Sequence, residues 1–227
     1  MLQQSELKTS FKQRLAIIIV AVVLLGSTVA LYMGIVLSYD NSTAGSTATT
    51  ADNARFEELY AEYQAQVNAR ANELSAEHFD TFAPHKSRVR SFNAAAITEI
   101  ATTDLVVGTG AEVTEDFVDY SAYYIGWLAD ETIFDSSLDS TTEPTALKFP
   151  LAGGQMIAGW NQGIIGMHLG GIREIAIPSE LAYGDQEQGA IPANSPLKFV
   201  VMLIPKVADI DWSEEMYELY TKIYGSQ

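Results

Sequence analysis

Three short segments of this chain gather large apolar and aromatic side chains around few polar groups. They read Phe134-Asp135-Ser136-Ser137, Gly153-Gly154-Gln155-Met156-Ile157-Ala158-Gly159-Trp160 and Ile177-Pro178-Ser179-Glu180-Leu181-Ala182-Tyr183-Gly184. Together they offer no activated nucleophile, no cluster of metal ligands and no strong base. A pocket lined by such residues can still accelerate a reaction if that reaction is a rotation about a bond.

Other arrangements of reactive residues do not support a different chemistry. The histidines His78, His85 and His168 have no metal-ligand spacing, and the sequence contains no cysteine that could join them. No Gly-x-Ser-x-Gly motif occurs, and Gly108-Thr109-Gly110 lacks the third glycine of a dinucleotide-binding motif. We therefore expect neither a metal ion nor another cofactor.

Further residues around the three segments complete three ordered sets. The first set is Tyr124-Ile125-Gly126-Trp127-Leu128 with Phe134 to Ser137. The second is Phe149-Pro150-Leu151, Gln155 to Trp160, Gly163 and Gly166-Met167. The third is Arg173 to Pro178, Leu181 to Gly184, Ile191-Pro192 and Leu197-Lys198-Phe199. In this order, over about residues 104–207, the sets resemble the FKBP-type (macrolide-binding) peptidyl-prolyl cis–trans isomerases.

The resemblance implies an α+β domain over residues 88–207, in which a curved antiparallel β-sheet wraps around one short α-helix. The residue pattern independently favours strands mixed with one short helix. Strand-like segments lie at 89–100, 117–127, 173–177 and 197–204, and a helix-like segment lies at 158–167.

The resemblance also implies which residues form the site. The catalytic groups are expected to be Tyr124, Asp135, the backbone N–H of Ile157, and Tyr183. The substrate-binding side chains are expected to be Phe134, Leu147, Met156, Trp160, Ile191 and Phe199, with Trp160 as the floor beneath the proline ring. Taken singly, each of these aromatic residues is more often ordinary core than a ligand contact, so the prediction depends on the ordered set.

The chemistry that such a site suits is the cis–trans rotation of an X–Pro amide, which is slow because rotation abolishes amide resonance. The twisted amide carries less charge separation than the planar one, so a pocket that excludes water removes solvation that opposes the twist. A fixed hydrogen bond to the substrate carbonyl adds to this effect. For Asp135 we expect a positioning role, either as an acceptor for Ser136, Ser137 or a backbone N–H, or by holding Tyr124.

The sequence departs from the family pattern at several positions. Leu147 stands at a wall position that is usually aromatic, and Ala152 replaces a common glycine. Glu131 replaces the glycine of a tight turn, where it is strained if the turn needs a positive φ. The loop 185–190 is one residue shorter than in some relatives. These differences bear on the catalytic rate, on substrate preference and on affinity for macrolides.

The charge of the chain favours an exported domain whose acidity keeps it soluble. The net charge is −16, from 13 Lys and Arg against 29 Asp and Glu, although 48% of the residues are hydrophobic. An acidic surface repels phosphate groups, so we expect no nucleic-acid partner.

The segment 15–37 is an uncharged, mostly apolar run that predicts a transmembrane signal anchor. As a helix it would extend about 34 Å, and a bilayer core needs about 30 Å. Residues 1–14 hold Lys8, Lys12 and Arg14, so this tail is expected in the cytoplasm and the remainder outside it. A cleaved signal peptide is the alternative, because Thr28-Val29-Ala30 offers small residues for cleavage.

Two helical segments flank the isomerase-like domain. Small residues at 38–54 predict a flexible linker. Residues 55–80 predict an amphipathic helix with a heptad pattern that Arg70 interrupts, at Phe56, Tyr60, Tyr63, Val67, Arg70 and Leu74. This helix either lies on its own domain or forms a homodimer through residues 55–78. Residues 208–227 predict a C-terminal helix that begins near Asp211.

The combined prediction is a single-pass membrane protein with an extracytoplasmic peptidyl-prolyl isomerase that acts on proline-containing chains of exported or surface proteins. Macrolides are further expected ligands by resemblance. The alternative is a non-enzymatic membrane-tethered chaperone or binding module that uses the same pocket and the helical arm. A third interpretation is a structural anchor that oligomerises through its helix.

Overall fold

The computed structural model describes residues 48–117, 119–154 and 156–224. The described chain divides into two compact units, of which one is Ala54–Tyr217 and the other joins residues 48–53 to residues 218–224. The predicted tail 1–14, the predicted transmembrane segment 15–37 and positions 38–47 of the predicted linker lie outside the described residues. Within the described ranges, no helix is both long and apolar enough to cross a bilayer.

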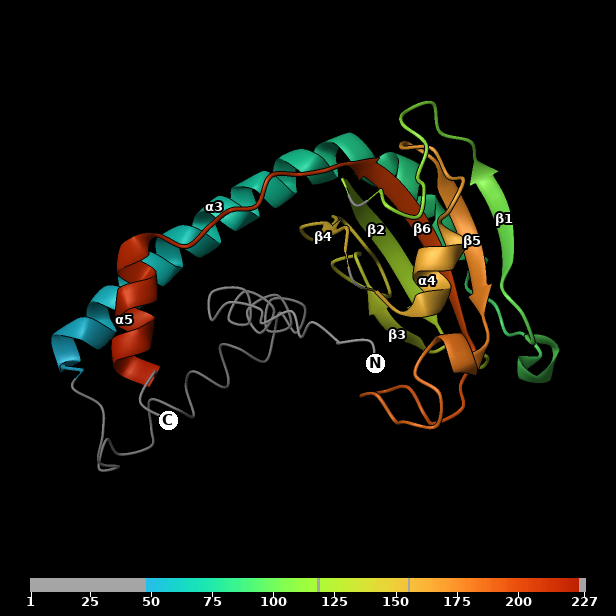
Figure 1. Cartoon of the computed structure of the whole chain (residues 1–227). Coiled ribbons are helices and arrows are strands. Elements are labelled where there is room, and N and C mark those ends of the chain that lie inside the picture. Colours follow the sequence, from blue (N-terminus) through green and yellow to red (C-terminus); the bar gives the residue numbers. More distant parts are fainter. Residues whose placement is uncertain (1–47, 118, 155, 225–227) are drawn as a thin grey trace, which may run out of the picture. The chain divides into compact units, whose positions relative to one another are not determined.

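The larger unit is built on a six-stranded antiparallel sheet with the order β1-β5-β6-β2-β3, and β4 pairs with β2 (Figure 1). The strands are β1 (Ala101–Val106), β2 (Tyr120–Trp127), β3 (Ile133–Ser136), β4 (Leu151–Ala152), β5 (Ile172–Ile177) and β6 (Leu197–Pro205). The short helix α4 (Ala158–Gly163) packs against β5, so the expected antiparallel sheet with one central helix is confirmed.

Both faces of the sheet are buried at its central strands β2, β5 and β6, which the sequence did not indicate. All eight residues of β2 are buried. Its alternate side chains enter different hydrophobic clusters: Tyr124 and Trp160 of α4 belong to the first cluster, whereas Tyr123, Ile125 and Leu74 of the helix on the opposite face belong to the second cluster. A strand buried on both faces has no polar alternation, which is why its sequence is a run of aromatic, small and apolar residues.

The second face is covered by the long helix α3 (Thr50–Phe82), which begins earlier and ends later than the predicted helix 55–80. Its last three turns bury Ala71, Leu74 and Phe82, and Ser75 Oγ accepts a 2.8 Å hydrogen bond from the N–H of Leu147. Arg70, by contrast, is exposed and pairs with Glu73. This half of α3 therefore packs on its own domain, as one of the two alternatives anticipated.

The predicted strand 89–100 is wrong. After the 3₁₀ turn η1 (Ala83–Arg88), this segment contains only the short 3₁₀ turn η2 (Ala94–Ala96). It binds the ends of the strands instead: the N–H of Phe92 donates to the carbonyl of Ala129 at 3.1 Å, and Trp127 Nε1 donates to the carbonyl of Arg90 at 3.0 Å. We call residues 89–98 the strap.

Glu131 has the positive φ that was anticipated for its turn, at 74°. The turn is closed by hydrogen bonds from Leu128 N to Thr132 O and from Glu131 N to Leu128 O, at 2.9 and 3.0 Å. A residue with a Cβ in this conformation is strained by about 1–2 kcal/mol. Its carboxylate is used, however, because Oε1 accepts a 2.9 Å hydrogen bond from the N–H of Ser91 in the strap.

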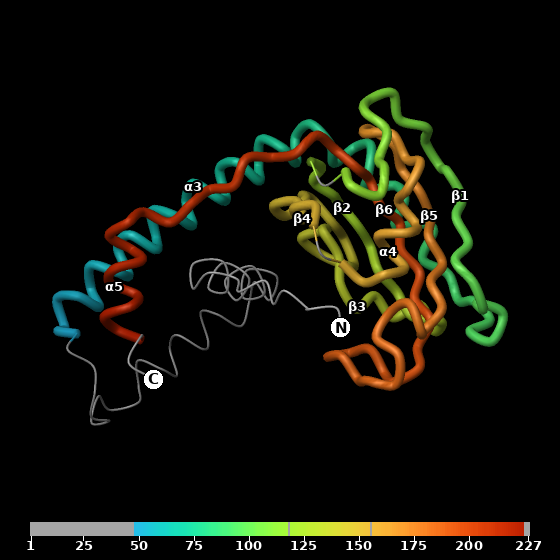
Figure 2. The backbone as a smooth tube through the Cα atoms, in the orientation of Figure 1, coloured from blue at the N-terminus to red at the C-terminus, as the bar shows by residue number. Residues whose placement is uncertain are grey.

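The C-terminal helix α5 (Glu214–Tyr224) begins three residues later than the predicted start at Asp211. Ser213 caps it, since its Oγ accepts a hydrogen bond from the N–H of Met216 at 3.2 Å. Figure 2 follows the connection from β6 to α5 as the red part of the tube. On this connection Trp212 packs edge-on against Phe56 of α3, with ring centroids 5.7 Å apart.

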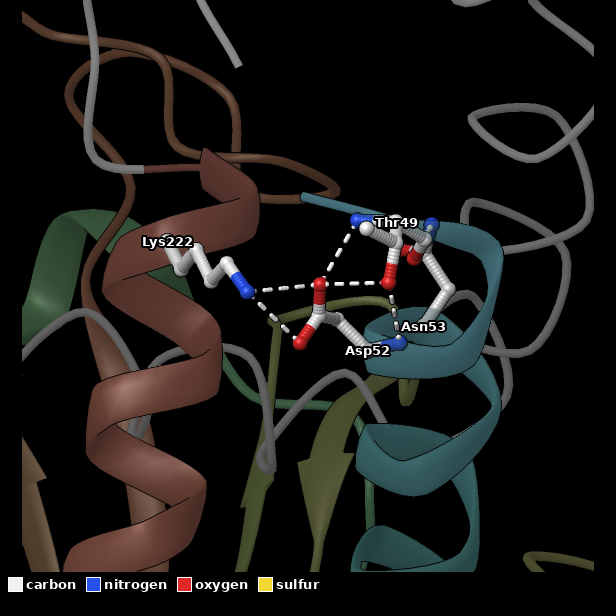
Figure 3. A network of polar contacts seen from close by, with 4 residues as sticks. All are labelled: Thr49, Asp52, Asn53 and Lys222. Atoms are coloured by element: carbon white, nitrogen blue, oxygen red, sulfur yellow. Dashed lines mark hydrogen bonds and ion pairs between the residues drawn. The ribbon is translucent and has the colours of Figure 1, made fainter. Parts of the chain in front are cut away.

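In the smaller unit, the first turn of α3 is capped and tied to α5 (Figure 3). The N–H of Asp52 donates to Thr49 Oγ1 at 3.2 Å, and Asp52 Oδ2 accepts from the N–H and hydroxyl of Thr49 at 2.6 and 2.7 Å. This is a reciprocal capping arrangement. Lys222 Nζ donates to both oxygens of Asp52, at 2.8 and 2.7 Å. The predicted linker 38–54 is thus wrong over its last residues, which are helical.

Phe82→Ala tests whether α3 belongs to the core of the larger unit. Phe82 is 0% exposed and lies within the second cluster. Its truncation is expected to lower the free energy of unfolding by about 3–5 kcal/mol, measured by urea denaturation. The control Glu62→Ala changes an exposed residue of the same helix and should change it by at most about 0.5 kcal/mol. Equal effects would show that α3 does not cover the sheet in solution.

The carboxyl group of Asp52 reports the contact between α3 and α5. Hydrogen bonds from Lys222 and then Thr49 lower its pKa from 3.8 to about 2. Because the pKa is lowered on folding, the stabilisation is present above pH 3.8 and is lost as the pH falls toward about 2. A carboxyl NMR titration should give a midpoint of about 2, and Lys222→Gln should move it toward 3.8. A midpoint near 3.8 in the unaltered chain would contradict the contact.

Candidate functional site

Four of the predicted site residues form a continuous series of edge-to-face aromatic contacts. Tyr124 of β2 meets Trp160 of α4 with ring centroids 5.7 Å apart, and Trp160 meets Phe199 of β6 at 5.4 Å. Phe199 in turn meets Phe134 of β3 at 5.6 Å, and all three interplanar angles lie between 83° and 88°. Such pairs are favoured by the ring quadrupoles, so the arrangement is rigid as well as apolar.

Gly126 makes this series possible, and the sequence analysis did not single it out. It pairs with Phe199 across β2 and β6. A Cβ at this position would lie 2.6 Å from a ring atom of Phe134 and 2.7 Å from one of Phe199. Both rings therefore occupy the space that any other residue would need.

The carboxylate of Asp135 holds Tyr124, which is one of the two positioning roles expected for it. The Tyr124 hydroxyl donates to Oδ2, and Oδ1 accepts a 2.8 Å hydrogen bond from the N–H of Ser136. Burial, followed by the neighbouring Asp135 charge, raises the pKa of Tyr124 above its usual range. The phenol therefore stays protonated and keeps donating to the carboxylate across the neutral and moderately alkaline range.

Tyr183 lies at the exposed border of this group. Its side chain is 37% exposed, in contrast to the 7% of Tyr124. Its pKa is raised by burial and then by the charge of Asp135, so the phenols of Tyr124 and Tyr183 both experience the same carboxylate. Tyr183 is therefore the hydroxyl of the site that solvent reaches.

Met156, Ile157 and Ile191 complete the apolar surroundings of Trp160. Met156 and Ile157 are partly buried against the first cluster, and Ile191 belongs to it with 5% exposure. Ile157 is the N-cap residue of α4, and no acceptor among the described residues takes its N–H. An unused N–H at a helix start is a ready hydrogen-bond donor for a carbonyl group.

Two expectations about the site need correction. Leu147 does not reach it, because its side chain is 2% exposed within the second cluster, on the α3 side of the sheet. Trp160 is not an open floor, because it is 0% exposed. The partly buried side chains around it must move before a proline ring can touch the indole.

Two glycines allow α4 to lie close to the sheet and so place Trp160. A Cβ on Gly159 would lie 2.2 Å from Cγ2 of Ile177, and one on Gly163 would lie 2.6 Å from Cγ2 of Ile175. These glycines are four residues apart and therefore share one face of the helix. Their spacing was the available sequence signal for this close packing.

Arg173 of β5 fixes the end of α4, and sequence reasoning missed this role. Its Nη1 donates to the carbonyls of Gly163 and Ile165 at 3.0 and 2.9 Å. Its Nε and Nη2 donate to Asp104 of β1 at 2.6 and 3.2 Å. Carbonyls at a helix end favour a cation, and the bidentate carboxylate holds the guanidinium in place. A helix this short depends on such outside contacts.

Comparison with known proteins agrees with this geometry. Residues 110–204 match the family model described as FKBP-type peptidyl-prolyl cis-trans isomerase. An FK506-binding protein of Neisseria meningitidis serogroup A is 42% identical over 102 residues, which cover 44% of this chain and 90% of that protein.

Two further known proteins are similar to part of this chain. FK506-binding protein 2 of Debaryomyces hansenii is 48% identical over 84 residues, covering 37% of this chain and 60% of that protein. This chain thus spans less than two thirds of the length of that relative. The solved structure of AtFKBP13 is 36% identical, with a TM-score of 0.39, and the match covers 48% of this chain and 93% of AtFKBP13. The chain belongs to the FKBP-type peptidyl-prolyl cis–trans isomerase family.

Asp104→Asn tests the support of α4 by Arg173. The change removes the carboxylate that orients the guanidinium, so amide hydrogen exchange within residues 158–165 is expected to accelerate about tenfold. Because Asp104 is largely exposed, the loss in unfolding free energy should be only about 1 kcal/mol. Asp116→Asn, at an exposed position before β2, is the matched control. Unchanged exchange in α4 would contradict the support.

Proposed function

We propose that this chain catalyses the cis–trans isomerisation of X–Pro bonds in polypeptides. The observation that carries the proposal is the aromatic series from Tyr124 to Phe134, with the Tyr124–Asp135 hydrogen bond at its side. This arrangement is apolar, preorganised and without a group that needs to exchange protons. Membership of the isomerase family supports the same activity.

The proposed mechanism uses desolvation and one fixed donor. A proline ring enters among the aromatic side chains after the partly buried residues Met156 and Ile157 move aside. Water then no longer solvates the planar amide, and the twisted amide becomes relatively more favourable. The N–H of Ile157 donates to the substrate carbonyl, while Asp135 keeps the Tyr124 phenol in one orientation.

We also propose where the protein acts. The apolar segment 15–37 supports a membrane anchor with the N-terminus in the cytoplasm and the isomerase domain outside it. Its substrates would then be exported or surface polypeptides. Macrolides are further proposed ligands of the aromatic site, supported by the names of the FK506-binding relatives.

A membrane-tethered chaperone without catalytic activity is the second candidate function. The complete burial of Trp160 favours it, because the substrate must first displace neighbouring side chains. A homodimer through residues 55–78 would add a second binding site per particle. This dimer is the weaker proposal, since the last turns of α3 already pack on the sheet.

The full chain in detergent should accelerate proline-limited refolding and the exchange of an Ala-Leu-Pro-Phe peptide. Trp160→Ala is expected to lower kcat/KM about ten- to hundredfold, because it removes the centre of the aromatic series. Asp135→Ala should lower it about tenfold by releasing Tyr124.

Circular dichroism controls for folding, and Asp116→Ala serves as the charge-matched variant, expected to keep full activity. Suppressed aggregation without any acceleration would favour the chaperone instead. Equal activity of Trp160→Ala and the unaltered chain would refute the proposed site.

A further inference from the structure

A cavity of about 370 Å³ lies outside the aromatic series. Its lining residues are Ala94, Ala95, Ile97, Thr98, Ser179, Glu180, Asn194 and Pro196. The volume is within the range of about 300–1,000 Å³ that is usual for ligand pockets. Half of the lining comes from the strap, which precedes the region 110–204 that matches the family model. Half of the cavity lining therefore lies N-terminal to the matched region.

The cavity is joined to the candidate site through the turn that carries Tyr183. The N–H of Gly184 donates to the carbonyl of Ser179 at 2.8 Å, and the carbonyl of Gly184 accepts from the N–H of Asn194 at 2.7 Å. Two walls of the cavity are thus hydrogen-bonded to the residue next to Tyr183. Tyr183 of the candidate site and two lining residues of the cavity therefore belong to one hydrogen-bonded turn.

Glu180 is the charged residue of the lining. Among the residues that the structure describes, its carboxylate makes no ion pair and no side-chain hydrogen bond. The two segments that form the cavity, 93–100 and 178–196, also contain Glu99, Asp185 and Glu187 but no lysine, arginine or histidine. No cation of these two segments neutralises Glu180, so a cationic group that enters the cavity gains a partner without displacing one.

We propose that this cavity binds a lysine or arginine side chain of the substrate polypeptide, located a few residues from the proline that is isomerised. Glu180 pairs with the cationic head, and the hydroxyl groups of Thr98 and Ser179 accept its remaining hydrogen bonds. This inference rests on the proposed isomerase function and gives it a substrate class: proline-containing chains with a nearby basic residue.

The test is a set of peptides with the sequence Ala-Leu-Pro-Phe at the centre. Lysine, or glutamine as its uncharged match, is placed in turn at each of three positions before and after this centre. The unaltered full chain should favour lysine at one or two positions by about two- to fivefold in kcat/KM at low ionic strength. The preference should shrink in 0.5 M salt, because the charges are screened.

Two variants separate the cavity from general electrostatics. Glu180→Gln should abolish the lysine preference and leave the glutamine peptides unchanged, and Ala95→Phe should do the same by filling the cavity. Glu62→Gln removes the same charge from an exposed position of α3 and should keep the preference. A preference that survives both cavity variants, or one that never appears, would overturn the inference.

A binding measurement keeps this inference distinguishable from the proposed catalysis. The same peptides are titrated into ¹⁵N-labelled protein and the amide signals of Thr98, Glu180 and Asn194 are followed. Shifts of these signals with lysine peptides, lost in Glu180→Gln, support the cavity even if no peptide is isomerised faster. Shifts confined to the aromatic series would refute it while leaving the isomerase intact.

Discussion

The central strand β2 is buried on both faces, and most of the structure follows from that constraint. Helix α4 with Trp160 covers one face of the strand, and helix α3 covers the other. A strand without solvent contact depends on internal partners for its polar groups, and among the described residues only the Tyr123 hydroxyl of β2 has none. Ser121 accepts from the N–H of Val207, and Tyr124 donates to Asp135. The hydrogen bond that orients the site is thus also one that β2 requires for stability.

The sequence was most informative where side-chain identity alone decides the contact. The four aromatic residues of the series could be predicted because they recur in family order. The paired strands β2 and β6 place two of them, Tyr124 and Phe199, on a shared face. Leu147 could not be assigned in the same way. It lies between β3 and β4 in an irregular segment, where the two-residue alternation of strands does not apply. The structure places it on the α3 side instead.

Contacts between distant parts of the chain were the hardest to predict from the sequence. Arg173 and Asp104 are 69 residues apart, and neither lies in a motif that predicts the other. The cover that α3 gives to the sheet was visible only as an amphipathic pattern, which is equally typical of a dimer. The burial of Trp160 depends on how neighbouring side chains pack above it, and no spacing rule contains that information.

Glu131 connects the matched region 110–204 to the strap that precedes it. A glycine there would relieve the positive φ, yet it would remove the carboxylate that accepts from Ser91 in the strap. The strap is otherwise held at this edge by the backbone of Phe92 and Arg90. Strain of about 1–2 kcal/mol at Glu131 is offset in part by this charge-assisted hydrogen bond. The same strap then forms half of the cavity beside Tyr183. The strained residue in this tight turn thereby helps to fix a wall next to the site.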